Sequence, residues 1–279
     1  MRARPSSRPS RKPPSLTVAV AEPAPSGADF ARIRANNPSP MTLSGTNTYV
    51  VGRDPAWVID PGPDDDAHIE AVRAEGEARG GIGGVLLTHS HADHSAGVES
   101  LGAPLLWGAV SSWDEMNWQP DPERRPANDA PPEFEVVPTP GHAADHAAFV
   151  WGDVCFCGDI ILGEGSTIVP PEAFGGSLSD YLASLKRLRE LDASLFAPGH
   201  GEWITDPRAK IDEYIAHRAA REQTLLVAIN SGERSRKALL DDTWHDVPEV
   251  LRGAAALAMQ AHLEKLEAEG LVDTAALEN

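Results

Sequence analysis

Cysteine is scarce in this sequence, because the 279 residues include only Cys155 and Cys157. Two cysteines one residue apart are too close for an easy disulfide, and a disulfide-stapled secreted domain needs more of them. The chain also lacks any run of about 18 apolar residues, so we expect no transmembrane helix and no membrane partner. These absences favour the reducing cytoplasm, with both cysteines buried as small apolar residues on one face of a strand.

Acidic residues are absent from the first 21 positions, which contain five Lys and Arg residues. Subtracting this +5 from the net charge of −18 leaves −23 for the remainder of the chain. The Pro- and Ser-rich start lacks the apolar core of a secretory signal, so we expect residues 1–25 to be a disordered basic tail. A body this acidic repels polyanions, which argues against nucleic-acid binding unless a local basic groove exists.

Short apolar runs alternate with helical patterns up to residue 200, and only helical patterns follow. This order predicts an α/β domain over residues 26–205 and a helical domain over residues 206–279. A strand is expected to run through V-L-L-T-H to His89, a hairpin to turn at Gly152, and Ser179-Asp180 to cap a helix. The C-terminal helices, followed by Gly270 and a short strand, look like a winged-helix module.

Three of the ten histidines crowd into L-L-T-H-S-H-A-D-H-S-A-G. Alternate residues of a strand point the same way, so His89 and His91 can converge on one point. The turn that follows brings Asp93 and His94 to a neighbouring point. The pattern supports two adjacent metal positions, and imidazole with carboxylate suits Zn²⁺, with iron and manganese as alternatives.

Further ligand-type residues follow predicted strands, each beside a glycine. His142 ends T-P-G-H, Asp159 ends C-G-D and His200 lies in A-P-G-H-G. Asp60, in V-I-D-P-G, holds an equivalent position. Sites in α/β proteins form at this edge of the sheet, so these residues are expected to join the histidine cluster.

Together the motifs resemble the metallo-β-lactamase superfamily. The segments N-P-S-P-M-T-L-S-G-T-N-T-Y-V-V-G, G-D-I-I-L-G-E-G-S-T and Y-I-A-H-R-A-A-R-E-Q are similar to its lactamase-β-like protein 2 branch, which is related to hydroxyacylglutathione hydrolases. The resemblance covers roughly residues 30–275 and implies a four-layer αββα sandwich followed by a winged-helix-like helical domain. The loop at residues 165–177 looks longer than that pattern leads us to expect.

The resemblance also implies how the candidate residues divide between two Zn²⁺ ions per chain. The first ion would be held by His89, His91 and His142, the second by Asp93, His94 and His200, with Asp159 bridging the two. Asp60 would orient a ligand histidine. Two such ions about 3.5–4 Å apart share a water whose pKa falls toward about 7, and the bridging hydroxide attacks a carbonyl or phosphoryl centre. Asp93 and Asp159 are the predicted catalytic carboxylates.

The function implied is that of a metal-dependent hydrolase. An ester or thioester substrate, either a small molecule or an acyl-thioester, is slightly favoured, because a thiolate leaving group needs no basic groove. Single-stranded RNA, cleaved by an endoribonuclease, is the alternative within the same branch. A mononuclear iron persulfide dioxygenase is a further alternative, since some relatives keep H-x-H-x-D-H around one iron.

Other residues have plainer interpretations. His146 and Asp145 are expected to be hydrogen-bonded at a strand start, and His68, His245 and His262 to lie at the surface or in satisfied core positions. For His217, facing the site and packing at the domain junction remain equally open. The Trp113–Trp118 segment either presents aromatic surface to substrate or folds over the core.

The C-terminal region does not look like a DNA-binding module. Residues 208–279 carry nine Lys and Arg against thirteen Asp and Glu. Groove-binding modules are usually basic on one face. We therefore expect no duplex DNA partner, and a domain that either walls the active-site cleft or forms a homodimer contact.

Overall fold

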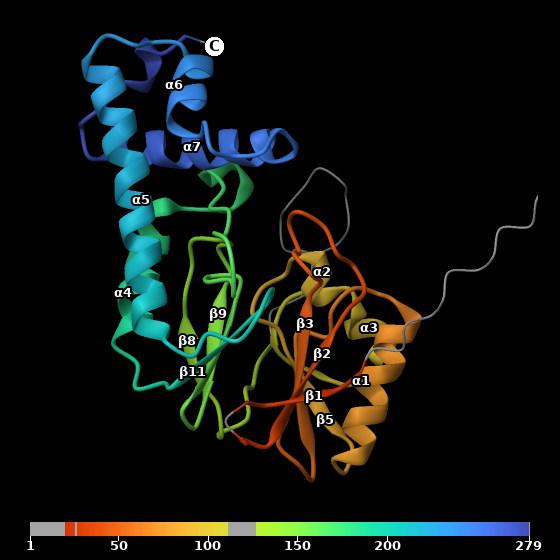
Figure 1. Ribbon diagram of the computed structural model, residues 1–279. Helices are drawn as coiled ribbons and strands as arrows, with labels where there is room; N and C mark the ends of the chain where they lie inside the picture. Colours follow the sequence, from red (N-terminus) through yellow and green to blue (C-terminus); the bar gives the residue numbers. More distant parts are fainter. Residues whose placement is uncertain (1–19, 26, 111–126, 279) are drawn as a thin grey trace, which may run out of the picture.

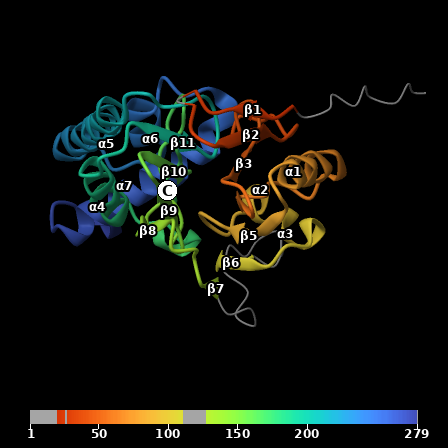
Figure 2. The ribbon, with the colours of Figure 1, turned by 90° about the horizontal axis from the view of Figure 1, so that it is seen from below.

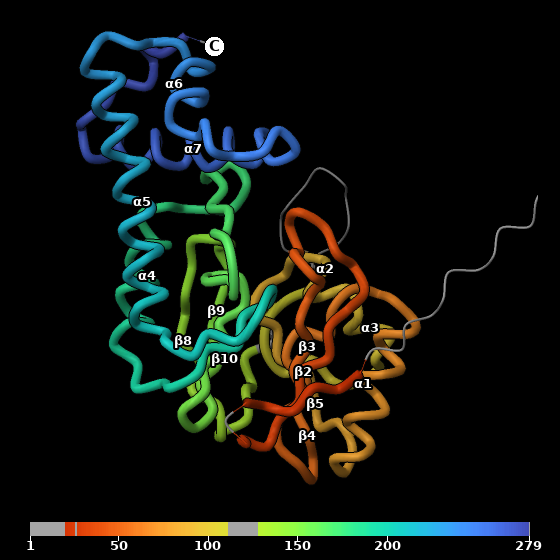
Figure 3. The backbone as a smooth tube through the Cα atoms, in the orientation of Figure 1, coloured from red at the N-terminus to blue at the C-terminus, as the bar shows by residue number. Residues whose placement is uncertain are grey.

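The computed structural model describes residues 20–25, 27–110 and 127–278. Two β-sheets pack face to face with helices on their outer faces, and a helical unit at the C-terminus extends beyond one end of the pair (Figure 1). The first part of the chain builds one sheet and the second part builds the other, as the backbone trace shows (Figure 3). Residues 1–19 of the predicted tail and the Trp113–Trp118 segment lie outside the described residues. The tail was predicted to reach residue 25, but residues 20–25 are described and Glu22–Pro23 form a strand.

The first sheet has the order β1 to β7. Its strands are β1 (Glu22–Pro23), β2 (Phe30–Arg34), β3 (Asn47–Val51), β4 (Ala56–Ile59), β5 (Ile82–Leu86), β6 (Leu105–Gly108) and β7 (Ala127–Asn128). The β4–β5 and β5–β6 pairs are parallel, and the other pairs are antiparallel. Ile59 is paired with Leu86. Asp60 and the residues after Leu86 therefore leave the sheet at the same edge.

The second sheet has the order β11-β10-β9-β8. Its strands are β8 (Glu135–Pro138), β9 (Ala147–Trp151), β10 (Val154–Gly158) and β11 (Leu195–Pro198). The antiparallel β9–β10 pair confirms the hairpin predicted at Gly152. β10 and β11 are parallel, with Gly158 paired to Pro198, so Asp159 and His200 also follow at one edge.

The helices complete four layers (Figure 2). The first sheet is covered by α1 (Asp66–Ala78) and α3 (Gly97–Leu101), and the second by α4 (Leu178–Arg189) and α5 (Pro207–Asn230). Aromatic rings fill the space between the sheets, where Phe30 meets Phe156 edge-on with ring centroids 5.2 Å apart. The αββα arrangement confirms the predicted fold class.

Cys155 and Cys157 lie on the face of the second sheet that packs against α4. Both are free and fully buried, as expected from the sequence. Burial raises the pKa of both thiols, since a thiolate would be desolvated there. They are packing residues of the core.

The C-terminal unit continues from α5 through α6 (Arg236–Thr243), the 3₁₀ turn η2 (Glu249–Leu251), α7 (Arg252–Ala268) and the 3₁₀ turn η3 (Thr274–Ala276). Its core contains Leu225, Leu239, Trp244, Leu263 and Leu266. The helices fall where the sequence predicted them, but the expected wing strand after Gly270 was wrong. The described chain has η3 there, and a single bridge joins Glu278 to Ser235.

The start of helix α4 also differs from the prediction. Helix α4 begins at Leu178, after the turn η1 (Glu172–Phe174), and its cap is Ser177, whose side chain accepts from the backbone N–H of Asp180. The predicted cap at Ser179 was therefore wrong by two residues.

Within the described ranges, no helix is both long and apolar enough to cross a membrane.

Candidate metal centre

The seven predicted ligands lie in short segments that follow strands at one edge of the two sheets. His89 and His91 follow β5 in an irregular stretch, and Asp93 and His94 lie on the short helix α2 (Ala92–Ser95). The strand predicted to reach His89 was too long, because β5 ends at Leu86. The two histidines converge because Thr88 and α2 are anchored to neighbouring segments.

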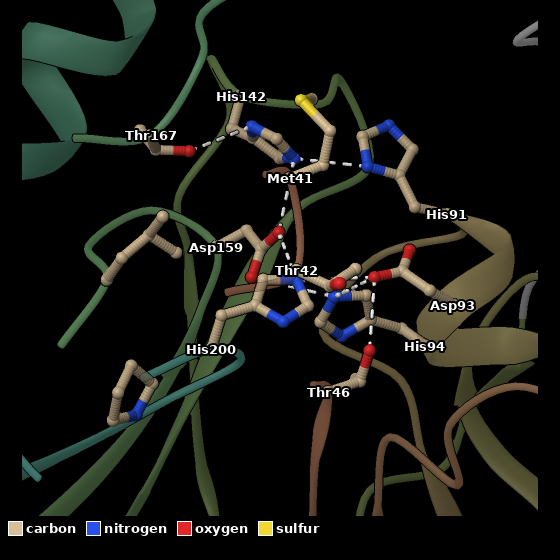
Figure 4. A network of polar contacts seen from close by, with 12 residues as sticks. Met41, Thr42, Thr46, His91, Asp93, His94, His142, Asp159, Thr167 and His200 are labelled. Carbon is tan, nitrogen blue, oxygen red and sulfur yellow. Dashed lines mark hydrogen bonds and ion pairs between the residues drawn. The ribbon is translucent and has the colours of Figure 1, made fainter. Parts of the chain in front are cut away.

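The second sheet supplies the remaining ligands. Asp159 follows β10 directly, His200 follows β11 by two residues, and His142 lies in the turn between β8 and β9. The structure thus brings together residues separated by more than a hundred positions. In Figure 4 the labelled ligand side chains point toward one another from both sheets.

Three groups of side chains could each hold a cation, because within each group the ligand atoms lie within 4.8 Å of one another. The groups are His89 with His91 and His142, Asp93 with His94 and His200, and His89 with His94 and Asp159. The first two groups match the division implied by the resemblance. Asp159 lies between them, with Oδ2 at 3.2 Å from His200 Nε2 and 3.9 Å from His142 Nε2.

The donor set fits divalent cations. His94 Nε2 and Asp159 Oδ1 are buried, and neither has a hydrogen-bond partner among the described residues. Buried polar atoms are normally paired, so two such atoms facing each other at 3.5 Å point to a ligand between them. Imidazole nitrogen and carboxylate oxygen are the donors that zinc and related metals take.

The pKa values divide the histidines into two classes. Burial, reinforced by neighbouring rings, lowers the pKa of His89 well below its usual value and that of His91 to about 3. Burial also opposes a charge on His94, but the carboxylates of Asp93, Asp159 and Asp60 outweigh it and raise its pKa well above normal. For His200 the same balance, dominated by Asp159, raises the pKa to about 9. The first group is therefore neutral and ready to bind a cation, whereas the second holds protons that a cation would displace.

Asp60 orients a histidine from each group. It is 2% exposed, and its carboxylate accepts from the Thr88 backbone N–H and hydroxyl, both at 2.7 Å, and from His94 Nδ1 at 2.9 Å. Because the Thr88 hydroxyl donates to Asp60, it accepts from His89 Nδ1 at 3.0 Å. Both rings are thereby left with Nε2 toward the site. The Asp60 backbone is left-handed, at φ 50°, and its carbonyl accepts from Thr48.

His146 holds the backbone of Asp159. Its Nδ1 pairs with the Thr139 hydroxyl at 2.8 Å, and its Nε2 accepts from the Asp159 backbone N–H at 3.2 Å. Burial lowers the pKa of His146 well below normal, so the ring stays neutral and Nε2 stays an acceptor. The expectation of a hydrogen-bonded residue at a strand start is confirmed. Burial raises the pKa of the neighbouring Asp145 carboxyl.

Sequence reasoning missed the residues that orient His142. Its Nδ1 donates to the Ile168 carbonyl at 2.8 Å, and the Thr167 hydroxyl lies 3.3 Å from the same nitrogen. Arg218 of α5, 3% exposed, donates to the Thr167 carbonyl and, at 3.2 Å, to the Ser166 hydroxyl. Ser166, Thr167 and Arg218 lie in two of the segments quoted for the family resemblance, but these segments are about fifty residues apart, so the sequence did not indicate that they touch.

The other histidines lie outside the metal-ligand groups. His68 and His262 are buried, with His68 Nε2 paired to the Thr48 hydroxyl at 2.8 Å, and His245 is exposed. His217 is half-buried at the junction of the two parts of the chain and lines a cavity that also reaches His142 and Asp159. His217 therefore packs at the domain junction and also lines the cavity beside the site, so both interpretations left open for it describe its position.

Comparison with known proteins finds family matches for most of the chain. The family model described as the metallo-beta-lactamase superfamily matches residues 41–129 and 127–200, and the one described as the beta-lactamase associated winged helix domain matches residues 244–277. The beta-lactamase-like protein 2 homolog of Drosophila melanogaster is 33% identical, over 86% of this chain and 88% of the relative. The atrochrysone carboxyl ACP thioesterase of Aspergillus fumigatus is 31% identical, over 75% of this chain and 68% of that protein. The crystal structure of a metallo-beta-lactamase family protein from Thermus thermophilus superimposes with a TM-score of 0.67 and 26% identity, covering 86% of this chain and 94% of the other.

Proposed function

The chain belongs to the metallo-β-lactamase superfamily, and from this premise we propose that it is a dinuclear zinc hydrolase acting on an ester or thioester. The observation that carries the proposal is the pair of ligand groups beside Asp159, together with the mainly apolar cavity that His142 and Asp159 line. Two divalent cations in these groups would supply a water nucleophile at neutral pH and a polarised carbonyl.

The residues of the chain have distinct tasks in this reaction. His89, His91 and His142 would hold the first cation and Asp93, His94 and His200 the second, with Asp159 available to both. Asp60 and Thr88 fix the rings of His94 and His89, and the Thr167–Ile168 loop fixes His142. Burial of these groups keeps bulk water away, so the interactions that orient them are strong.

An uncharged acyl substrate suits this site better than RNA does. The net charge is −18, and Arg221, which lines the cavity, already donates to both carboxylate oxygens of Asp246 at 2.8 and 2.9 Å. Phosphate contacts need free cationic side chains. A relative that matches 75% of this chain is named as a thioesterase, which supports an acyl substrate.

The test is to give zinc-loaded protein two substrates in parallel, an N-acetylcysteamine thioester and end-labelled single-stranded RNA. We expect thioester hydrolysis by the wild type and a loss of at least a hundredfold in Asp159→Asn, with no RNA cleavage by either protein. Asp180→Asn, on the exposed start of α4, is the matched control. Metal content measured on the same samples should be near two zinc per chain.

Other outcomes assign the protein differently. RNA cleavage that Asp159→Asn abolishes would make it an endoribonuclease. One iron per chain together with oxygen-dependent persulfide consumption would make it a dioxygenase.

A further inference from the structure

A cavity of about 290 Å³ opens beside the candidate metal centre and reaches the C-terminal unit. His142 and Asp159 line it at one end, and Trp244, Val247 and Leu251 line it on the side of the C-terminal helices. In Figure 1, α5 carries the chain from α4 to α6 and α7, beyond the end of the second sheet. A group held in this cavity therefore lies next to the atoms at which a substrate would be cleaved.

The wall of the cavity is mainly apolar on both sides. Met41, Leu43 and Leu162 of the first domain line the cavity together with Trp244, Val247 and Leu251. Three alanines of α7, Ala254, Ala255 and Ala258, form part of the same wall, and their small side chains leave the space open. An apolar cavity of about 150 Å³ is enough to hold benzene, so this one has room for a larger group.

The wall contains two basic and three acidic residues. Arg218 and Arg221 are the basic ones, and Glu164, Asp246 and, at the end near the metal centre, Asp159 are the acidic ones. Arg221 is paired with Asp246, and Arg218 donates to Ser166 and Thr167. Burial lowers the pKa of His217, which adds no charge at neutral pH. Among the described lining residues, both guanidinium groups already donate to the protein, and Arg218 Nε is buried without a partner. With three acidic residues in the same wall, this arrangement disfavours a phosphate or carboxylate in this space.

We propose that this cavity binds the acyl group of the substrate, and that the group is uncharged, largely apolar and bulkier than acetyl, such as a branched chain or a ring. The inference rests on the proposed ester or thioester hydrolysis and adds the acyl class to it. The C-terminal unit then selects the substrate, through α7 and the segment before it, while the first domain carries the reaction. Pockets at domain junctions, with mostly apolar walls, are the usual sites for such groups.

The experiment compares the acetyl and phenylacetyl thioesters of N-acetylcysteamine with zinc-loaded full-length protein. We expect kcat/KM to be at least tenfold higher for phenylacetyl. Ala258→Leu and Leu251→Trp narrow the cavity, and each should reduce this ratio at least tenfold, because apolar pockets discriminate by about that factor per methylene. Ala256→Leu, on the same helix but outside the cavity lining, should leave the ratio unchanged.

A second measurement separates binding from turnover. Phenylacetamide, which is neutral and carries the same acyl group, should bind the wild type and Ala256→Leu with equal affinity by calorimetry, and the two narrowed variants at least tenfold more weakly. Thermal unfolding of each variant shows that it is folded, and Leu251 is partly exposed, so Leu251→Trp keeps the test valid if Ala258→Leu destabilises α7.

The outcomes distinguish this inference from the function on which it rests. Thioester hydrolysis with a phenylacetyl-to-acetyl ratio near one, or a ratio that falls equally in Ala256→Leu, overturns the acyl assignment and leaves the hydrolase intact. If neither thioester is hydrolysed but phenylacetamide binds as described, the proposed reaction is wrong and the cavity is still a site for an apolar group.

Discussion

A buried imidazole with no partner is costly, and His262 in α7 is such a residue. It is 1% exposed, and neither ring nitrogen has a hydrogen-bond partner among the described residues. Its ring packs against Trp244 with centroids 5.7 Å apart. Burial, followed by the positive charge of Arg218, lowers its pKa from 6.5 to about 3, so the ring is neutral in the folded chain.

We predict that His262→Leu makes stability less dependent on pH. The unfolded chain binds the extra proton between about pH 6.5 and 3, so the free energy of unfolding falls as the pH falls through that window. The leucine variant has no such loss. Relative to wild type, its free energy of unfolding should rise by about 1 kcal/mol from pH 7.5 to 5.5, measured by urea denaturation.

The matched control is Gln223→Leu, since Gln223 is exposed on α5 and has no titratable group. Its difference from wild type should be the same at both pH values. The other buried histidines titrate equally in all three proteins. The quantity to compare is therefore each variant's difference from wild type in free energy of unfolding, at pH 7.5 and at pH 5.5. A difference for His262→Leu that is constant with pH would contradict the prediction.

At the scale of elements, helix α5 links the C-terminal unit to the metal centre. Arg218 leaves the middle of this helix and donates to the loop of Ser166 and Thr167, and the next residue, Ile168, accepts from His142. The guanidinium also lies 5.4 Å from the Tyr181 ring centroid of α4. The Arg218 side chain therefore fixes α5 relative to the loop of residues 166–168, and this loop in turn orients the ligand His142.

We expect Arg218→Met to weaken metal binding without touching a ligand. Loss of the guanidinium leaves the Thr167 carbonyl without its donor, which costs about 1–3 kcal/mol of stability and frees the loop that orients His142. Zinc affinity, measured by competition with a chromophoric chelator, should fall about tenfold. Arg208→Met, at the exposed start of α5, should have normal affinity, and equal affinities in all three proteins would show that the loop needs no anchor.

The elements differed in how well the sequence indicated them. The β9–β10 hairpin and the long helix α5 followed from turn residues and helical spacing, which are local signals. The ends of β5 and α4 were misplaced, because they depend on where Thr88 meets Asp60 and where Ser177 caps the next turn. The wing strand was wrong because residues 274–276 form a 3₁₀ turn capped by the Asp273 side chain.

The candidate ligands were easier to recognise than their supports. His89, His142 and His200 are chemically distinctive residues close to the ends of predicted strands, and Asp60 sits before Pro-Gly at a strand end. The roles of Ile168 and Arg218 depend on a backbone carbonyl and on a contact across the two parts of the chain. Arg218 lies in a segment that resembles the family, but nothing in a single sequence indicates which residues it contacts.

At the scale of the whole molecule, the candidate ligands come from both sheets. His89 and His94 follow the first sheet, and Asp159 and His200 follow the second. A cation that binds only the folded chain stabilises it by about 2.7 kcal/mol at a hundredfold excess over its dissociation constant. The centre therefore ties the two halves of the sandwich together.

We predict that chelation lowers the free energy of unfolding by about 3 kcal/mol for each of the two proposed ions, relative to protein in a hundredfold excess of zinc over its dissociation constant. Urea denaturation followed by tryptophan fluorescence, with and without EDTA, measures this difference. His200→Ala, which removes a ligand of the second ion only, should lose about half of the difference, and His245→Ala should retain it. A full zinc effect in His200→Ala would place the stabilising ion elsewhere.

The candidate ligands lie between residues 89 and 200, while the far wall of the cavity lies between residues 244 and 258. Under the proposals above, the reaction is encoded before residue 200, and part of the choice of substrate is encoded in a separate stretch of the chain. Substitutions within residues 244–258 would then change the preference for substrate without changing the candidate metal ligands. Lineages that inherit the same ligand set are then free to diversify by changing α7 and the segment before it, and exchanging that stretch between relatives would transfer preference without transferring catalysis.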